Sequence, residues 1–512
     1  MPAHFVAVLD SAWGHLRPAI HILLDILHIA PSAAVTLIVD RKGSRRIQQE
    51  LSAHPKLNAA VQGRWRVVPV IDENGPDILD SDGSKIEHEF KEHFDEWMKK
   101  VMRGDGQGAF GSAPNVALIH IRSVPAWMKR VREISVECGI APDQLKCLVI
   151  STSLTTAFLC MLENALEIKQ AQDKNANDQD AIDKAVYDIK NPDRILQYPY
   201  LPPMRYFEFG LQGVGSNVDH RKANPAMQSF LLAPLEADGL INSGTPEMEP
   251  EATRLTSEMA KMPVYCVGHG PKEGDEKETI PLVVNNSKLP TDDGRAIRFL
   301  DACQAEYGVR SVAYISFGTS RWLERPEIVD YLVASLLAAE PALPFIFSAA
   351  SVNAELSKET IQRVEGSGRG LLSSWVPQMT VLSHPATSFY VSHMGCGSMY
   401  EGILAGLPLV MVPQFADQPI NAAIMSEKRV GVQLYQFGAE MVNRTYANGV
   451  KYTGDEKAIR AEMDEVWRMM RGKEGDDMRS RMRELREVVR GSWESGRARE
   501  GLQALGRLIT QA

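Results

Sequence analysis

The sequence predicts an α/β protein made of two doubly wound domains, each with a parallel sheet covered by helices. Short apolar runs rich in β-branched residues alternate with amphipathic stretches through all 512 residues, a pattern typical of parallel sheets with crossover helices. This length is enough for two or more domains with ample cores. Residues 269–295 are rich in charge, proline and asparagine, as expected of an interdomain linker.

The first domain is expected over residues 1–268 and begins with a strand at 5–9. Its loop occupies 10–16, and Pro18 opens a helix that reaches about residue 27, because proline suits a helix start. Residues 169–191 are expected to form a surface helix or a mobile insert, and 198–205 a proline-rich loop. Further strands are expected at 35–39, 65–71, 147–151, 240–243 and 263–268, with a polar helix from about 44.

One stretch of this domain has two interpretations. Between 86 and 101 the apolar residues recur at steps of three and four, as on one face of a helix. Packing of this face on the sheet is the preferred interpretation, and a wall of a binding pocket is the alternative. The residues concerned are Ile86, Phe90, Phe94, Trp97 and Val101.

The second domain is expected over residues 296–490. It begins with a helix at 296–306 and a strand at 311–317, followed by a turn at 318–320. The helix predicted at 399–405 is stopped by Gly406 and Pro408. The other elements expected are strands at 344–347, 388–392 and 409–412, helices at about 456–471 and 475–489, and a last helix at about 494–510 within the tail 491–512.

Composition excludes several classes of protein. The net charge of −9 and the absence of a long basic run give no support to nucleic-acid binding. Six scattered cysteines form no C-x-x-C pair, so neither a zinc site nor a disulfide framework is indicated. The first strand starts at once and no run of 18 apolar residues occurs, so we expect a cytoplasmic chain without signal peptide or transmembrane segment. The oligomeric state cannot be predicted.

The segment from Trp375 to Gln418 has the features of a nucleotide site. A buried strand, the Gly-containing turn 393–398 and a helix start follow one another, and such a helix start binds phosphate through its free N–H groups and its dipole. Trp375 offers a flat face for a base, and Glu401 can accept hydrogen bonds from a ribose diol. Asp417 and Gln418 could bind sugar hydroxyls. The spacing does not match a P-loop, and no lysine lies in the turn.

These residues resemble a known signature. The 44 residues from W-x-P-Q to D-Q are similar to the C-terminal box of the family 1 UDP-sugar glycosyltransferases, of the soluble plant and fungal kind. The resemblance implies the GT-B fold, two Rossmann-like domains facing across a cleft, with a final helix that returns to the first domain. The matching positions are Trp375, Pro377, Gln378, His384, Pro385, His393, Gly395, Ser398, Glu401, Gly406, Pro408, Asp417 and Gln418.

The resemblance also implies roles for single residues. Trp375 would stack on uracil and the backbone of Val376 would pair with its edge, while Gln378 and Glu401 would hold the ribose. Asp417 and Gln418 would bind the sugar. Gln418 favours glucose by family habit, but Cys396 and Gly397 replace a tryptophan and an asparagine of the family, so a different sugar such as xylose stays open. The diphosphate would be held, without metal or cofactor, by Thr319, His393 and the turn Gly395, Cys396, Gly397 and Ser398.

For catalysis the resemblance implies that His15, in the first loop, takes the proton from the acceptor hydroxyl. The family usually pairs this histidine with an aspartate, but Thr152 stands after Val149-Ile150-Ser151 where that aspartate is expected. The base is then weaker, or another carboxylate substitutes, or the acceptor is acidic enough to need no help. The implied activity is inverting transfer of a sugar from a UDP-sugar to a small, fairly apolar acceptor, such as a secondary metabolite. The alternatives are a UDP-sugar-binding protein with impaired catalysis and, more weakly, a nicotinamide-dependent oxidoreductase that lacks G-x-G-x-x-G.

Overall fold

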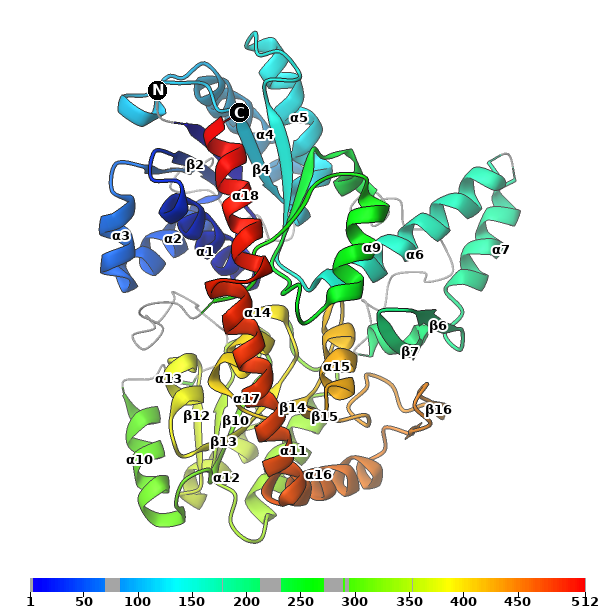
Figure 1. Cartoon of the computed structure of the whole chain (residues 1–512). Coiled ribbons are helices and arrows are strands. Elements are labelled where there is room, and N and C mark those ends of the chain that lie inside the picture. Colours follow the sequence, from blue (N-terminus) through cyan, green and yellow to red (C-terminus); the bar gives the residue numbers. More distant parts are fainter. Residues whose placement is uncertain are drawn as a thin grey trace. The chain divides into compact units, whose positions relative to one another are not determined.

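A computed structural model describes residues 3–69, 83–176, 178–211, 232–270, 289–290, 294–351 and 353–511. The chain divides into two compact units (Figure 1). The first comprises Met1–Lys169, Asn224–Gly270 and Gly491–Ala512, and the second comprises Gln170–Ala223 and Pro271–Arg490. The sequence assigned residues 170–211 to the first domain, whereas they cluster with the second unit. Most of the predicted linker lies outside the described residues.

The first unit is built on a sheet of seven parallel strands among the described residues, in the order β3-β2-β1-β4-β5-β8-β9. Every residue of β1 is buried, because helices cover both faces of the sheet. The strands are β1 His4–Val8, β2 Ala34–Val39, β3 Trp65–Pro69, β4 Val116–His120, β5 Lys146–Ser151, β8 Gly239–Asn242 and β9 Val264–Cys266. The sequence analysis missed β4 altogether.

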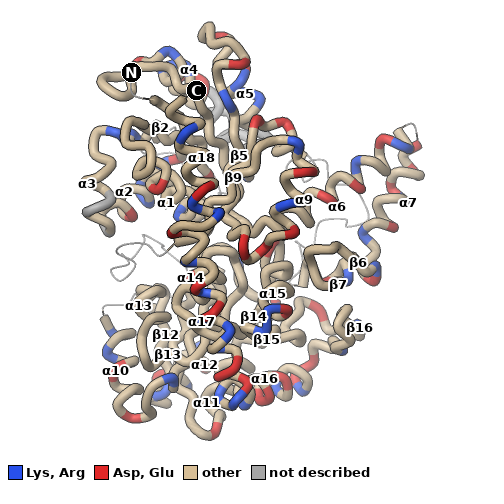
Figure 2. Tube along the Cα trace, viewed as in Figure 1, with Lys and Arg blue, Asp and Glu red and all other residues tan. Residues whose placement is uncertain are grey.

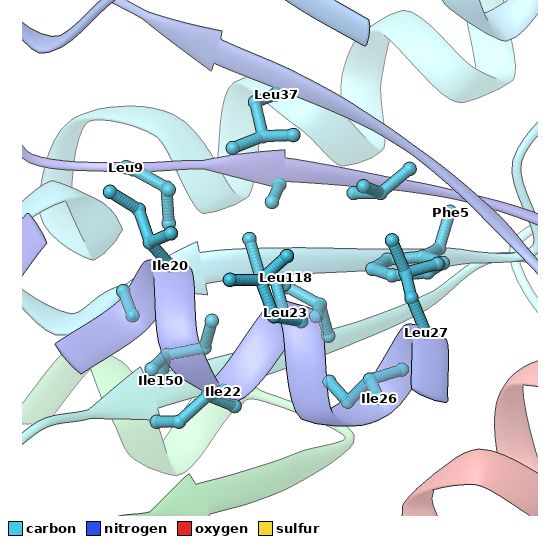
Figure 3. Packing of buried hydrophobic residues seen from close by; sticks show 14 of the residues in the cluster. Phe5, Leu9, Ile20, Ile22, Leu23, Ile26, Leu27, Leu37, Leu118 and Ile150 are labelled. Atoms are coloured by element: carbon cyan, nitrogen blue, oxygen red, sulfur yellow. The ribbon is translucent and has the colours of Figure 1, made fainter. Parts of the chain in front are cut away.

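Alternation along these strands fills two cores. Phe5, Leu37 and Leu118 point to one face, where they pack against Leu23 and Leu27 of α1 (Figure 3). Their neighbours in the chain point to the other face, under α4 and α5. The helices of the unit are α1 Trp13–Ile29, α2 Arg41–Ala53, α3 Pro55–Val61, α4 Gly83–Met102, α5 Val124–Glu137, α6 Thr155–Lys174, α9 Pro250–Ala260 and α18 Arg497–Gln511, with α6 passing into the second unit at its end.

Helix α1 begins at Trp13 and contains Pro18, so placing its start at the proline was wrong. On α4, Phe94 and Val101 are buried in the core, which supports packing on the sheet, but Trp97 is 36% exposed and lies under the Lys100 ammonium. The side chains of Ile86 and Phe90 lie outside the described residues. The last helix, α18, packs on α1 and β9 through Leu502, Leu505 and Ile509 (Figure 1).

The second unit contains a sheet of six parallel strands among the described residues, in the order β12-β11-β10-β13-β14-β15. The strands are β10 Val312–Ser316, β11 Phe345–Ser348, β12 Gly370–Ser373, β13 Thr387–Ser392, β14 Leu409–Met411 and β15 Gly431–Gln433. The helices are α7 Gln179–Ile189, α10 Arg295–Tyr307, α11 Pro326–Ala338, α12 Lys358–Ser367, α13 Gln378–Ser383, α14 Cys396–Ala405, α15 Gln418–Glu427, α16 Glu456–Arg471 and α17 Lys473–Glu494, whose last turn belongs to the first unit.

Residues 195–211 form a hairpin and a short helix on the second unit, whereas a proline-rich loop was expected at 198–205. The hairpin strands are β6 Ile195–Tyr198 and β7 Leu201–Arg205, and β7 contacts α15. Oε1 of Glu208 accepts a hydrogen bond of 2.7 Å from the backbone of Ala447. Ala447 lies between the two short strands β16 Arg444–Thr445 and β17 Lys451–Tyr452. This contact joins the insert to the second unit.

Charged side chains of both signs are interspersed along the elements of both units (Figure 2). In the part of the chain that the structure describes, no helix combines the length and the apolar character that crossing a bilayer requires.

Candidate functional site

The turn between β13 and α14 has the geometry of an anion site. Gly395 is the N-cap of α14 and has no side chain that could cap the helix, while the backbone of Cys396 is hydrogen-bonded to Asp417. Met394 adopts a positive φ of 68°, and its N–H donates to Oγ of Ser392 at 3.1 Å. A Cβ added at Gly397 would meet no atom within 4 Å, so the space beside the turn is open. The N–H groups of the first helical turn can therefore reach a phosphate.

His393 is packed between two glycines at this turn. A Cβ at Gly318 would lie 2.6 Å from Nε2 of His393, and one at Gly395 would lie 2.7 Å from the same atom. Any larger residue at either position would displace the ring. Burial lowers the pKa of His393 to about 4, although the backbone of Ser316 acts in the opposite direction. The imidazole is thus neutral at pH 7 and offers a phosphate a hydrogen bond rather than a charge. Half-buried Thr319 follows Gly318 in the adjoining loop.

Asn421 connects the turn to the loop after β14, and the sequence analysis did not identify it. Its Nδ2 donates at 2.9 Å to the carbonyl of Met394 and at 2.9 Å to Oδ2 of Asp417. Burial raises the pKa of Asp417 to about 6, opposed by hydrogen bonds from Asn421 and from the backbone of Cys396. Oε1 of Gln418 accepts the backbone N–H of Gln414 at 3.0 Å. These contacts hold Asp417 and Gln418 beside the turn.

Gln378 and Glu401 lie against each other. Nε2 of Gln378 donates to Oε2 of Glu401 at 2.5 Å, and Oε1 of Gln378 accepts the hydroxyl of Tyr314 at 2.7 Å. The three residues come from α13, α14 and β10, so the hydrogen bonds align elements distant in the chain. Tyr314, buried in the sheet, was read as part of a strand and not as a site residue.

Trp375 follows β12 and is half-buried, while Val376 is 1% exposed. Oγ of Ser373 donates to the carbonyl of Trp375 at 2.7 Å, which fixes the backbone directly before the ring. The segments after β10, β12, β13 and β14 therefore carry all the residues that the sequence suggested for the nucleotide. They lie at the carboxyl ends of neighbouring parallel strands, where open α/β sheets bind ligands.

In the first unit, His15 lies in the first turn of α1 rather than in a loop. Its Nδ1 lies 3.1 Å from Oγ1 of Thr152, after β5. Nε2 of His120, the last residue of β4, lies 3.5 Å from the same oxygen, and Nδ1 of His120 accepts the backbone N–H of Arg122 at 3.3 Å. The rings of His15 and His120 are 5.1 Å apart and edge to face. His120 was not identified from the sequence, because its strand was not.

Among the described residues, few charged side chains lie near His15, Thr152 and His120. Burial lowers the pKa of His15 to about 4; Arg122 acts in the same direction and Asp10 against it. The pKa of His120 is also lowered well below its ordinary value, by burial and by the neighbouring His15 and Arg122. Oδ1 of Asp10 accepts the backbone N–H of Ala12 at 2.7 Å and lies 3.5 Å from Nη1 of Arg122. Both imidazoles are neutral at pH 7.

One cluster has the residue types of a metal site. Among the described residues, His21, Glu50 and His54 place their ligand atoms within 4.8 Å of one another, all buried. However, Oε1 of Glu50 accepts hydrogen bonds from His21 at 2.7 Å and from Arg17 at 3.0 Å, and lies 3.3 Å from His54. The guanidinium already supplies the positive charge that a cation would bring. The cluster is therefore best explained as a buried ion-pair network between α1, α2 and α3.

Part of the chain matches a known protein family. Residues 294–464 match the family described as UDP-glucoronosyl and UDP-glucosyl transferase. UDP-glycosyltransferase 91D2 of Stevia rebaudiana is 30% identical over 208 residues, which is 39% of this chain and 40% of that protein. UDP-glycosyltransferase eriJ of Hericium erinaceus is 24% identical over 470 residues, 88% of this chain and 85% of that one. The chain thus matches less than half the length of the first of these relatives.

Solved structures match over the full length. Medicago truncatula UGT71G1, in complex with UDP-glucose, has a TM-score of 0.69 at 16% identity, and the match covers 99% of this chain and 98% of that one. At this identity the likeness shows the fold, which is GT-B with two Rossmann-like α/β domains.

Proposed function

We propose that this chain, which belongs to the UDP-glucosyl transferase family, moves a sugar from a UDP-sugar to a hydroxyl of a small, fairly apolar acceptor. The observation that carries the proposal is the convergence of the turn 393–398, the Gln378–Glu401 pair and the Trp375 segment at one edge of the second sheet. The matched UGT71G1 structure holds UDP-glucose, which supports the same class of donor here. Glucose and xylose both stay possible, because Cys396 and Gly397 change the sugar side of the turn.

The donor roles follow from the chemistry of each group. The half-buried face of Trp375 would stack on uracil, and the backbone of Val376 would pair with its edge. The Glu401 carboxylate would accept the ribose hydroxyls. The N–H groups of the α14 start, the neutral His393 and Thr319 would hold the diphosphate, and they would stabilise the charge that develops as UDP leaves. Asp417 and Gln418 would bind the sugar hydroxyls. No cofactor enters this scheme, since the UDP-sugar is a co-substrate.

The proposed reaction is an in-line displacement with inversion. Nε2 of His15 takes the proton of the acceptor hydroxyl, and the acceptor oxygen forms a bond to the anomeric carbon. The bond between that carbon and the diphosphate oxygen breaks, and UDP leaves with the electron pair. Support comes from the position of His15, whose Nδ1 is engaged by Thr152 while the ring is neutral at pH 7. We also propose a cytoplasmic setting, which the six cysteines favour, since none of them forms a disulfide bond among the described residues.

The test is a screen of UDP-sugars against phenols, terpenoids and sterols, read by mass spectrometry, with His15→Ala beside wild type. We expect His15→Ala to bind UDP normally and to lose about 10²–10⁴-fold in turnover, the usual worth of a general base. His28→Ala is the matched control, because His28 is an exposed histidine of the same helix. UDP binding without any product would favour the alternative of a binding protein with impaired catalysis, and failure to bind UDP would overturn the family role itself.

A further inference from the structure

The hydrogen-bond partner of His15 is uncharged. Its Nδ1 meets only the Thr152 hydroxyl among the described residues, and that oxygen also faces Nε2 of His120. A neutral imidazole carries one N–H and one acceptor nitrogen. Because Nδ1 of His120 accepts the N–H of Arg122, its proton lies on Nε2, and this N–H donates to Oγ1 of Thr152. Thr152 thus accepts from one histidine and keeps its own proton available for the other.

This arrangement weakens His15 as a base in two ways. A carboxylate can only accept, so it would hold the proton of His15 on Nδ1 and leave Nε2 free to take another. A hydroxyl can also donate to Nδ1, which places the proton on Nε2 and blocks the base. A carboxylate would in addition stabilise the imidazolium after proton transfer. Thr152 brings no charge, and the N–H of His120 points its positive end at the same oxygen.

The surroundings do not supply the missing charge. Asp10, after β1, is the carboxylate that acts on His15, but it is engaged by the N–H of Ala12 and lies beside Arg122. His15 also occupies the first turn of α1, where the free N–H groups form the positive end of the helix dipole. A positive charge on the imidazole is disfavoured there. Among the described residues of the first unit, the titratable groups that face His15 are therefore Asp10, His120 and Arg122, from the ends of β1 and β4.

We propose that the acceptor carries an acidic hydroxyl, as a phenol or an enol does, and that His120, acting through Thr152, is the residue that confines the site to such acceptors. This inference rests on the proposed function. A phenol with an acidity like that of tyrosine has a pKa of about 10, whereas bulk water, which approximates an aliphatic alcohol, has about 16. A weak base can take the proton of a phenol as the bond to the sugar forms. To take the proton of an aliphatic alcohol, the base needs the support of a nearby carboxylate, which this site lacks among the described residues.

The first experiment uses the wild-type protein with UDP-glucose and matched acceptor pairs, such as 4-methylphenol and 4-methylbenzyl alcohol. We expect kcat/KM to favour the phenol by at least about 100-fold, within the range that general-base assistance is worth. The preference should lie in kcat more than in KM, since the two molecules are similar in size and polarity. Ring-substituted phenols of increasing acidity should react progressively faster until binding or product release limits the rate.

The second experiment places a carboxylate behind Thr152. In His120→Asp, the carboxylate would accept the Thr152 proton, so that Oγ1 could only accept from His15 and the base form would be held. Turnover of the benzyl alcohol should rise about 10-fold or more, and turnover of the phenol should change less. His120→Asn is the matched control, because it has the same size without the charge and should not gain alcohol turnover. Ser153 lies beside the site, but its side chain is hydrogen-bonded to that of Ser151. Ser153→Ala should therefore behave as wild type.

The outcomes separate the two proposals. Equal use of phenol and benzyl alcohol by the wild type would overturn this inference and leave the glycosyltransferase function intact. If His120→Asp and His120→Asn gain the same alcohol turnover, the charge of the side chain at position 120 does not cause the gain, and this part of the inference is wrong. No product with any acceptor would overturn the proposed function and this inference together. If His120→Asp fails to fold, as thermal melting would show, the acceptor series alone decides.

Discussion

Nδ1 of His15 and Oγ1 of Thr152 lie 3.1 Å apart, although 137 residues separate them in the chain. The reason is the order of the sheet. Strand β4 lies between β1 and β5, and in a parallel sheet the carboxyl ends of neighbouring strands meet at one edge. The residues after β1 and β5 therefore converge, with His120 at the end of β4 between them. A contact that no local pattern encodes follows from strand order alone.

Thr152→Asp should change the pH dependence of the reaction. A negative charge within about 4–6 Å of the imidazole favours its protonated form and raises its pKa above the present value, which burial holds at about 4. Since the neutral base is the active form, activity is lost as pH falls through this pKa, so the acid limb of kcat/KM should move to higher pH. The measurement is the pH profile of kcat/KM beside wild type.

Thr152→Asn is the control for this change, because it alters the shape similarly without adding charge. Both variants must first melt like the wild type, since a buried aspartate without a partner is costly. A folded Thr152→Asp with an unmoved acid limb would show that the group titrating in the profile is not His15.

Trp375→Ala should weaken UDP binding by about 1–3 kcal/mol, the range for stacking of a base on an aromatic ring, taken from single-stranded nucleic acids. Trp375→Phe should lose less, because a smaller flat surface remains. Isothermal titration with UDP measures both. Trp97→Ala removes a partly exposed tryptophan of the first unit and should leave UDP affinity unchanged. If Trp375→Ala binds UDP as tightly as wild type, the ring serves packing and not the base.

Glu401→Gln should reduce the ability to distinguish ribose from its deoxy form. The wild-type carboxylate accepts from Nε2 of Gln378, and its remaining lone pairs would accept the ribose hydroxyls; hydrogen bonds to charged groups are worth about 1.5–3 kcal/mol. We expect UDP to bind more tightly than 2′,3′-dideoxy-UDP to wild type, and the difference to shrink in the variant. An equal preference in both proteins would place the ribose elsewhere.

Glu50→Gln should destabilise the first unit. Removal of one partner from a buried ion pair costs about 3–5 kcal/mol, because the other charge stays buried, and Arg17 is only 15% exposed. Hydrogen bonds from His21 and His54 and the charge of Arg17 outweigh burial and hold the pKa of Glu50 well below its ordinary value of 4.5. A depressed pKa contributes stability above the unfolded value, and this contribution is lost as pH falls toward the folded value.

The stability difference between wild type and Glu50→Gln should therefore be full at pH 7 and shrink below about pH 4.5. Urea unfolding at both pH values measures it. Glu96→Gln, which breaks an exposed pair with Lys100, should barely alter unfolding. A wild-type protein that gains stability on addition of zinc, while Glu50→Gln does not, would speak against the ion-pair explanation.

The sequence by itself determined the fold class and the local structure of the segment proposed to bind the donor. The strand, turn and helix at 388–405 are set by local patterns, and the structure has β13, the turn and α14 there. Local patterns also located β1, β2, β5 and β10, because both faces of these strands are almost wholly buried and apolar residues predominate in them. The start of α1 was misplaced, since proline is tolerated within the first turns of a helix as well as at its first position.

Only the tertiary structure decided which strands are neighbours, and hence that His120 stands behind Thr152. It likewise decided that residues 195–211 join the second unit, through contacts such as the bond between Glu208 and Ala447, which are 239 residues apart. Periodicity records which side of an element is buried, but it carries no information about which element covers it. Apart from Thr319, the residues proposed to bind the donor follow one another along one segment, so the sequence could group them. The groups around His15 come from three separate strand ends, and strand order alone assembles them.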